Sequence, residues 1–182
     1  MLHFDIDDRE IERLQRNLGA TAHEVRYAFN RALRRTAGTI KRMSTKDIKD
    51  ELQLRSTKAL RRRLKLKRYS RRSMSEVLLW YGLNDLPVST FKGTPKKNAK
   101  GVAFRGEQFD GAFITKGMSG YRTVFKRAGA ARMPIKEQKL PIKDEMRVYV
   151  EDEIFDKVPE IFMRYFEQDL RARVIHGVGR KV

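Results

Sequence analysis

The 182-residue sequence contains no cysteine, which excludes disulfide bonds, thiolate catalysis and zinc sites built from cysteine. Long apolar runs are also missing. The longest is the five-residue segment VLLWY, far short of the roughly 20 residues that a membrane-spanning helix needs. The opening segment MLHFDIDDRE turns acidic at once and has no apolar signal core. Together these absences predict a soluble protein that is made in a cytoplasm and does not enter a membrane.

Recognisable catalytic and metal-binding patterns are absent too. No serine lies in a nucleophile elbow, and the glycine-containing segments RGEQFDG and GMSG lack the spacing of phosphate-binding or dinucleotide-binding loops. The histidines are scattered, without partners at metal-ligand spacing: His3, His23 and His176. One carboxylate cluster has the pattern of a solvated helix face and not of facing catalytic acids: Glu151, Asp152, Glu153 and Asp156. The sequence therefore predicts a protein that is not an enzyme and uses no metal or cofactor.

What the sequence has in excess is positive charge. Lysine and arginine number 41 against 23 aspartates and glutamates, which gives a formal net charge of +18. Most of the excess lies in residues 31–73, which hold 17 basic and 3 acidic residues. Cations crowded in this way repel one another. We therefore expect a partner outside the chain, either nucleic-acid phosphates or an acidic protein surface, to neutralise them.

Two sets of basic residues are candidate contacts. The first is a candidate polyanion or partner contact and consists of Arg55, Arg61, Arg62, Arg63, Lys65, Lys67, Arg68, Arg71 and Arg72. The second belongs to the loop after residue 91 and is a candidate inter-subunit surface: Lys92, Lys96, Lys97 and Lys100. A structural interpretation of the first set is a solvated face whose long side chains cover apolar surface. Since Tyr69 is the only aromatic residue among these arginines, any contact with DNA is expected at its phosphates, without sequence preference.

The N-terminal part of the sequence predicts helices. Asp7 or Asp8 is a suitable cap for a first helix, which ends at Gly19. Thr21 and Glu24 have the spacing of a capping box and open a long amphipathic helix over residues 21–43.

Two further short helices are predicted after this long helix. Ser44 and Asp47 repeat the capping pattern before TKDIKDEL, and Ser56 precedes TKALRRRL. Two short helices with a tight joint permit an alternative function, a non-enzymatic DNA-binding regulator that reads sequence with a helix pair at 44–63.

From Leu64 onwards the apolar pattern alternates, which is typical of strands. LKLKRYS, SEVLLWYG and PVSTF are predicted strands, and SEVLLWYG has a largely buried character. An exposed and mobile loop follows at 93–101. The runs VAFRG, GAFITKG and YRTVFKR then predict an antiparallel meander, because glycine-containing joints separate them. Its core face is expected to consist of Val102, Phe104, Phe113, Val124 and Phe125.

Residues 143–173 have apolar side chains at helical spacing and predict a C-terminal helix, which Pro159 should bend or divide. The remaining residues, 174–182, look frayed. We predict a single α+β domain over residues 1–182, in which a small antiparallel sheet packs with the long N-terminal helix and the C-terminal helix. Its parts are a mainly helical basic region at 1–63, a β-rich region at 64–142, the helix at 143–173 and the tail.

In order along the chain, several segments resemble the phage lambda-type minor tail protein Z family, also called prophage tail completion proteins. They are AFNRALRRTAGTI, LRRRLKL, GLNDLPVSTFKGTP, GVAFRGEQFDGAFI, TVFKRAGAARMPIKE and LPI, followed by the closing helix. The resemblance extends over roughly residues 20–173. It implies a virion structural protein of the tail, made in the bacterial host cytoplasm, that acts late in tail assembly near the head-proximal end.

The resemblance also implies partners. These are other tail or neck proteins and further copies of the same chain in the virion, with edge strands and the loop at 93–101 as candidate surfaces. The family brings no catalytic residues. A contact between the basic region and phage DNA is our own inference from the charge, and a neighbouring subunit is the alternative.

Overall fold

A computed structural model describes residues 8–69, 76–82, 84–143, 146 and 150–178. The chain forms two compact units, each built from segments that are distant in the sequence. Unit 1 consists of residues 1–44, 64–81 and 149–182, and unit 2 consists of residues 45–63 and 82–148. Helices and small antiparallel sheets make up the structure, which confirms the predicted α+β class. Whether the two units behave as one domain stays a prediction.

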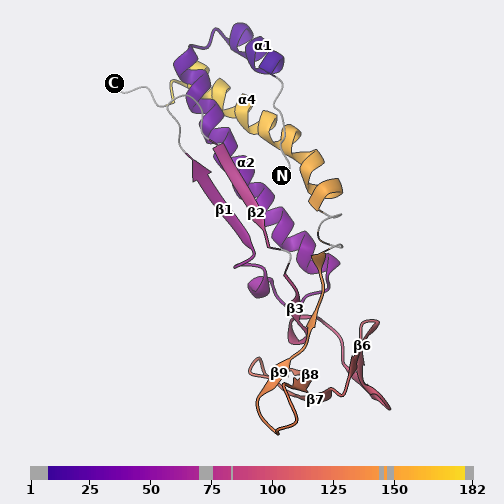
Figure 1. The fold of residues 1–182 in the computed structure, drawn as a ribbon. Helices are drawn as coiled ribbons and strands as arrows, with labels where there is room; N and C mark the ends of the chain where they lie inside the picture. The colour runs from indigo at the N-terminus through magenta and orange to yellow at the C-terminus, as the bar shows by residue number, and fades with distance from the viewer. Residues whose placement is uncertain (1–7, 70–75, 83, 144–145, 147–149, 179–182) are drawn as a thin grey trace. The chain divides into compact units, whose positions relative to one another are not determined.

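Three helices form the frame of unit 1: α1 (Asp8–Leu18), α2 (Ala22–Glu51, of which the part up to Ser44 belongs to unit 1) and α4 (Val158–His176). The ribbon shows α4 lying alongside α2 (Figure 1). The predicted capping box is present at the start of α2. The backbone N–H of Thr21 donates to Glu24 Oε2 at 2.9 Å, and the N–H of Glu24 donates to Thr21 Oγ1 at 3.2 Å. These bonds satisfy donors that the first turn of a helix leaves without partners.

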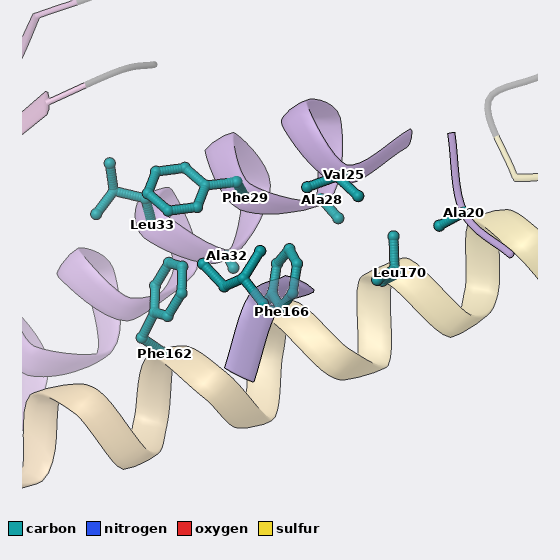
Figure 2. Packing of buried hydrophobic residues seen from close by; sticks show 10 residues of the cluster. Ala20, Val25, Ala28, Phe29, Ala32, Leu33, Phe162, Phe166 and Leu170 are labelled. Atoms are coloured by element: carbon teal, nitrogen blue, oxygen red, sulfur yellow. The ribbon is translucent and has the colours of Figure 1, made fainter. Parts of the chain in front are cut away.

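Aromatic side chains join α2 to α4. Phe29 contacts Phe162 edge to face with ring centroids 5.1 Å apart, and Phe162 stacks on Phe166 at 6.0 Å. Figure 2 shows these rings between the two helices, next to the small side chains of Ala28 and Ala32. Small residues let the helices approach closely, so the aromatic rings fill the remaining space. The whole cluster consists of Ile11, Ala20, Val25, Ala28, Phe29, Ala32, Leu33, Phe162, Phe166 and Leu170.

The helix α2 continues through Ser44, so the predicted helix start at this residue is wrong. The Ser44 hydroxyl is buried and donates to the carbonyl oxygen of Ile40 at 2.7 Å, one turn back, and the Tyr81 hydroxyl lies 2.9 Å from the same serine oxygen. A serine that bonds back to the preceding turn is tolerated inside a helix. Burial raises the pKa of Tyr81, and the bond to Ser44 partly opposes this shift.

The C-terminal helix is divided where Pro159 predicted a division. A π-helical turn, η3 (Val150–Ile154), and a 3-10 turn, η4 (Phe155–Lys157), precede α4. Pro159 lies in the first turn of α4, where its missing N–H costs no helical hydrogen bond. The first residues of the predicted tail are helical instead of frayed: α4 continues to His176 and ends at Gly177, which has the left-handed conformation with φ of 63°. Residues 179–182 lie outside the described part of the chain.

The predicted strands LKLKRYS and SEVLLWYG are confirmed as β1 (Leu64–Tyr69) and β2 (Glu76–Tyr81). They pair with each other in an antiparallel ribbon that belongs to unit 1. Lys65 pairs with Trp80 and Lys67 pairs with Leu78, so these four residues share one face of the ribbon.

The described residues of unit 2 form three small antiparallel sheets instead of the one meander that the sequence predicts. The expected pairing of VAFRG with GAFITKG is wrong, because the unpredicted strand β6 (Glu107–Asp110) pairs with β5 (Gly101–Phe104) instead. The runs GAFITKG and YRTVFKR do pair directly, as β7 (Phe113–Lys116) and β8 (Arg122–Arg127), but in a separate sheet. The segment PVSTF is mostly a 3-10 turn, η2 (Val88–Thr90), and not a strand. The strands are β3 (Leu86–Pro87) with β10 (Lys139–Leu140), then β4 (Lys96–Asn98), β5 (Gly101–Phe104) and β6 (Glu107–Asp110), then β7 (Phe113–Lys116), β8 (Arg122–Arg127) and β9 (Ile135–Glu137).

The predicted core face of these strands is partly confirmed. Val102, Phe104 and Val124 are buried, whereas Phe113 and Phe125 are half-buried and pair with each other across β7 and β8.

A polar contact also holds this unit together. The Glu137 carboxylate accepts from the buried Thr123 hydroxyl at 2.7 Å and from the N–H of Ser89 at 2.9 Å.

Replacing Gly38 by alanine should stabilise the protein. Gly38 lies inside α2, and a methyl group built there meets no atom within 4 Å. Alanine restricts the unfolded chain without a clash, so we expect the free energy of unfolding in urea to rise by about 0.5–1 kcal/mol. Gly101→Ala is the opposite control, because its φ is +147° and the new methyl group would lie 2.4 Å from the Phe109 carbonyl oxygen. Destabilisation by Gly38→Ala would contradict an uninterrupted helix at this position.

Candidate interaction surface

Part of the positive charge of unit 1 is neutralised between α2 and α4. The Asp169 carboxylate is only 5% exposed and lies 3.1 Å from Arg31 Nε and 2.7 Å from Arg173 Nε. Arg31 comes from α2 and Arg173 from α4, so one carboxylate links both helices. A buried charge without partners would be costly, and the two guanidinium groups compensate it here.

Other basic side chains of α2 contact neutral groups. The Arg35 guanidinium lies 4.2 Å from the ring centroid of Tyr165, and Arg34 Nε donates to the carbonyl oxygen of Asn30 at 3.1 Å. The Tyr165 hydroxyl lies 3.0 Å from Thr39 Oγ1, and this hydrogen bond lowers the pKa of Tyr165. Arg35 therefore contributes to the contact between α2 and α4, whereas Arg34 bonds within its own helix.

Two residues of the first candidate set, Arg55 and Arg63, have structural contacts within unit 2. Arg55 donates to the Gly93 carbonyl oxygen at 3.0 Å, and its guanidinium lies 4.3 Å from the centroid of the Tyr121 ring. Arg63 donates to the carbonyl oxygens of Asn84 and Asp85, the second at 2.9 Å. Both side chains connect distant segments of unit 2, so their guanidinium groups are less available to bind an external partner.

Arg61 and Arg62, in contrast, are exposed in the turn that leads to β1. Within the described part of the chain neither side chain takes part in an ion pair or a hydrogen bond. They are the residues of unit 2 that best fit the predicted polyanion contact.

Lys65 and Lys67 are exposed on one face of the β1–β2 ribbon of unit 1. The same face carries Trp80, which is 43% exposed, and the Lys65 ammonium lies 5.3 Å from the centroid of its indole ring. The prediction that SEVLLWYG is largely buried is therefore wrong for Trp80, and its other apolar residues are half-buried. The alternation of β2 contained this signal, because residues 78 and 80 must face the side opposite to 77, 79 and 81. The side chain of Arg68 and the residues Arg71 and Arg72 lie outside what the structure describes.

The second candidate set is exposed as predicted: Lys92, Lys96, Lys97 and Lys100. The segment is not simply a loop, however, because Lys96 and Lys97 belong to β4 and pair with β5. Asn98 closes the connection, since its side-chain oxygen accepts from the N–H groups of Lys100 and Gly101 at 3.1 Å and 2.9 Å. Sequence reasoning also missed the exposed acids of β6, Glu107 and Asp110, which lie at the other edge of the same sheet.

The described residues offer little to other kinds of site. No group of three or more histidine, aspartate or glutamate side chains among them is placed to hold a metal ion. A cavity of unit 1 between α2, β2 and the turns η3 and η4 has mainly apolar walls, lined among others by Leu33, Thr36, Ile40, Leu79 and Phe155. Among the described residues, no titratable side chain lines this cavity. Within the described ranges no helix is both long and apolar enough to cross a membrane.

Comparison with known protein families identifies a matching family. The prophage minor tail protein Z family matches residues 87–177, which is half of the chain. The chain belongs to this family. The match confirms the resemblance seen in the sequence, although residues 20–86 of the predicted range lie outside it. Neither the curated proteins nor the solved structures contain a match to this chain.

Membership in the minor tail protein Z family accounts for only part of the candidate surface. The matched range begins at β3 and ends at the C-terminus of α4, so it contains the sheet with Lys96 and Lys97. Arg61, Arg62, Lys65, Lys67 and Trp80 precede the matched range, and their exposure is a property read from this chain alone.

The structural and the exposed arginines should differ in their effect on stability. Arg63→Ala removes two hydrogen bonds to backbone carbonyl oxygens, and we expect it to lower the free energy of unfolding by about 1–2 kcal/mol. Arg62→Ala is the matched control, one residue away and exposed, and should change stability by less than about 0.5 kcal/mol. Urea denaturation followed by circular dichroism measures both values. Equal effects of the two variants would contradict the structural role of Arg63.

Proposed function

We propose that this minor tail protein is a structural component of the virion tail that acts late in tail assembly, near the head-proximal end. Family membership over residues 87–177 is the observation that carries this proposal. In this function the chain works by contact with other tail or neck proteins and with further copies of itself. Since the family is one of structural tail proteins, this function involves no chemical step.

The exposed cations are proposed to contact phage DNA or a neighbouring subunit. Arg61 and Arg62 of unit 2, and Lys65 and Lys67 of unit 1, have no ion-pair partner among the described residues. Their charge is therefore available to an external anion. A DNA duplex would meet them through its phosphates, and such binding depends strongly on salt and little on sequence.

Trp80 favours a protein partner for the ribbon of unit 1. An exposed tryptophan beside lysine side chains is typical of the anchor of a protein interface, because the indole gains free energy when a partner removes it from water. The phosphates of a DNA duplex would bind Lys65 and Lys67 but would leave the Trp80 ring exposed to water.

The alternative function, a regulator that reads DNA with a helix pair at 44–63, has lost its structural basis. Residues 45–51 are the last turns of α2, and the second predicted helix is only the three-residue 3-10 turn η1 (Thr57–Ala59). A recognition helix needs several turns to present side chains along the major groove. Ser56 does cap η1, by accepting from the N–H of Lys58 at 3.4 Å, but the helix that it was expected to begin does not continue.

The proposed location predicts that the protein is found in purified particles. Quantitative mass spectrometry of particles induced from the prophage should detect it at a constant ratio to the other tail proteins. Deletion of the gene should leave tails that do not join heads, which electron microscopy can show. Absence of the protein from complete particles would refute the proposal.

A DNA contact predicts a measurable dependence on salt. Arg61→Ala/Arg62→Ala should reduce the slope of log Kd against log salt by about 0.9 for each phosphate contact that is lost. Arg13→Ala/Arg171→Ala is the matched control, because it removes the same charge from residues that pair with acids of their own helices. Arg63 is left unchanged because its loss would disturb the fold. Equal slopes for both double variants would assign Arg61 and Arg62 to a protein partner.

A further inference from the structure

The sheet formed by β4, β5 and β6 has edges of opposite charge. One outer strand, β4, carries Lys96 and Lys97, and the other, β6, carries Glu107 and Asp110; all four are exposed. The middle strand β5 has no charged side chain. A single sheet of unit 2 therefore presents a basic edge and an acidic edge, and every residue of it is described by the structure.

Both edges are open in the described part of the chain. Among the strands that the structure describes, only β5 pairs with β4 or with β6. Beyond this ladder, the backbone hydrogen bond that β6 makes to another described residue is a turn contact, from the N–H of Ala112 to the carbonyl oxygen of Phe109 at 3.2 Å. Open strands offer unpaired N–H and C=O groups to another strand, and charged side chains decide which strand is accepted.

The register distributes the charges evenly over the two faces of this sheet. Lys96 of β4 and Gln108 of β6 both pair with Ala103 of β5, so they are aligned across the sheet. Lys97 and Phe109 are aligned in the same way through Val102. Because side chains alternate along a strand, Lys96 shares a face with Asp110, and Lys97 shares the other face with Glu107. Each face thus has a lysine at one edge and a carboxylate at the other.

We propose that β6 of one copy pairs with β4 of the next copy, so that the sheets of successive subunits join head to tail. This interface rests on the proposed self-association in the tail and specifies its surface. Because β4 and β6 are both antiparallel to β5, they run in the same direction. When the sheet of one copy continues in the same orientation into the sheet of the next, β6 of the first copy and β4 of the second therefore pair as parallel strands. Both faces then gain pairs of opposite charge.

The same charges disfavour the symmetric arrangements. Pairing β4 with β4, or β6 with β6, across a two-fold axis would place like charges opposite each other. A head-to-tail interface is heterologous, so it produces a closed ring when the rotation between subunits permits closure. Strands of three and four residues bury little surface, so the contact is weak in solution and gains strength where an assembly holds the copies side by side.

Disulfide trapping tests this contact, because the chain has no cysteine of its own. Two full-length variants that differ in tag length, Lys96→Cys and Asp110→Cys, are mixed and oxidised, and the products are separated on a non-reducing gel. We expect the mixed dimer to exceed both symmetric dimers clearly. Arg132→Cys, at an exposed position outside the strands, replaces Lys96→Cys in the control and reports the collision rate. A statistical mixture of the three dimers would overturn the proposal.

Charge reversal then tests whether the charges specify the pairing. Lys97 and Glu107 remain in the two cysteine variants, so Lys97→Glu in the first should reduce the yield of mixed dimer by about twofold to fivefold. Adding Glu107→Lys to the second variant should restore the yield. If the yield stays constant through both changes, the charged edges do not direct the contact and the inference fails.

The two proposals can fail independently. Particles that contain the protein but give no selective disulfide would leave the tail function intact and refute this interface. A selective disulfide from a protein that is absent from particles would support this interface and refute the tail function.

Discussion

The packing of Phe29 on α2 against Phe162 and Phe166 on α4 is the interaction on which unit 1 depends. Burial of each large aromatic side chain contributes roughly 1.5–3 kcal/mol, which is a large share of the net stability of a small unit. The rings can fill the interface because Ala28 and Ala32 are fully buried beside them. At the border of this packing, Asp169 bridges Arg31 and Arg173, so that apolar contact and charge pairing fix the same two helices.

The helical part of the fold was largely predictable because its signals are local. The capping box of Thr21 and Glu24 and the break at Pro159 each involve residues within one helical turn. Ser44 shows where such reasoning fails. Its spacing to Asp47 has the form of a helix start, but the structure uses its hydroxyl for Ile40 and Tyr81 instead. The second of these partners is 37 residues away, so no local pattern reveals it.

The β-rich part was harder to predict because pairing is not encoded locally. β6 has only Phe109 as an apolar residue, so the alternation that reveals a strand is too weak there. The candidate site has the same difficulty. Arg62 and Arg63 are neighbours of identical chemistry, and only Arg63 meets the carbonyl oxygens of residues 84 and 85. Composition predicted that cations are in excess, but the fold decides which of them remain available.

The discontinuous build of unit 1 has a consequence for the order in which the protein folds. Residues 1–44 are synthesised first, yet the apolar face of α2 packs against a helix that begins only at Val158. Residues 82–148, which complete unit 2, emerge from the ribosome before that helix does. During synthesis the apolar face of α2 that carries Phe29 therefore lacks its α4 partner until about 130 further residues have been added. This delay exposes the nascent chain to aggregation or chaperone binding, because apolar surface without its partner is what misfolding and chaperones both recognise.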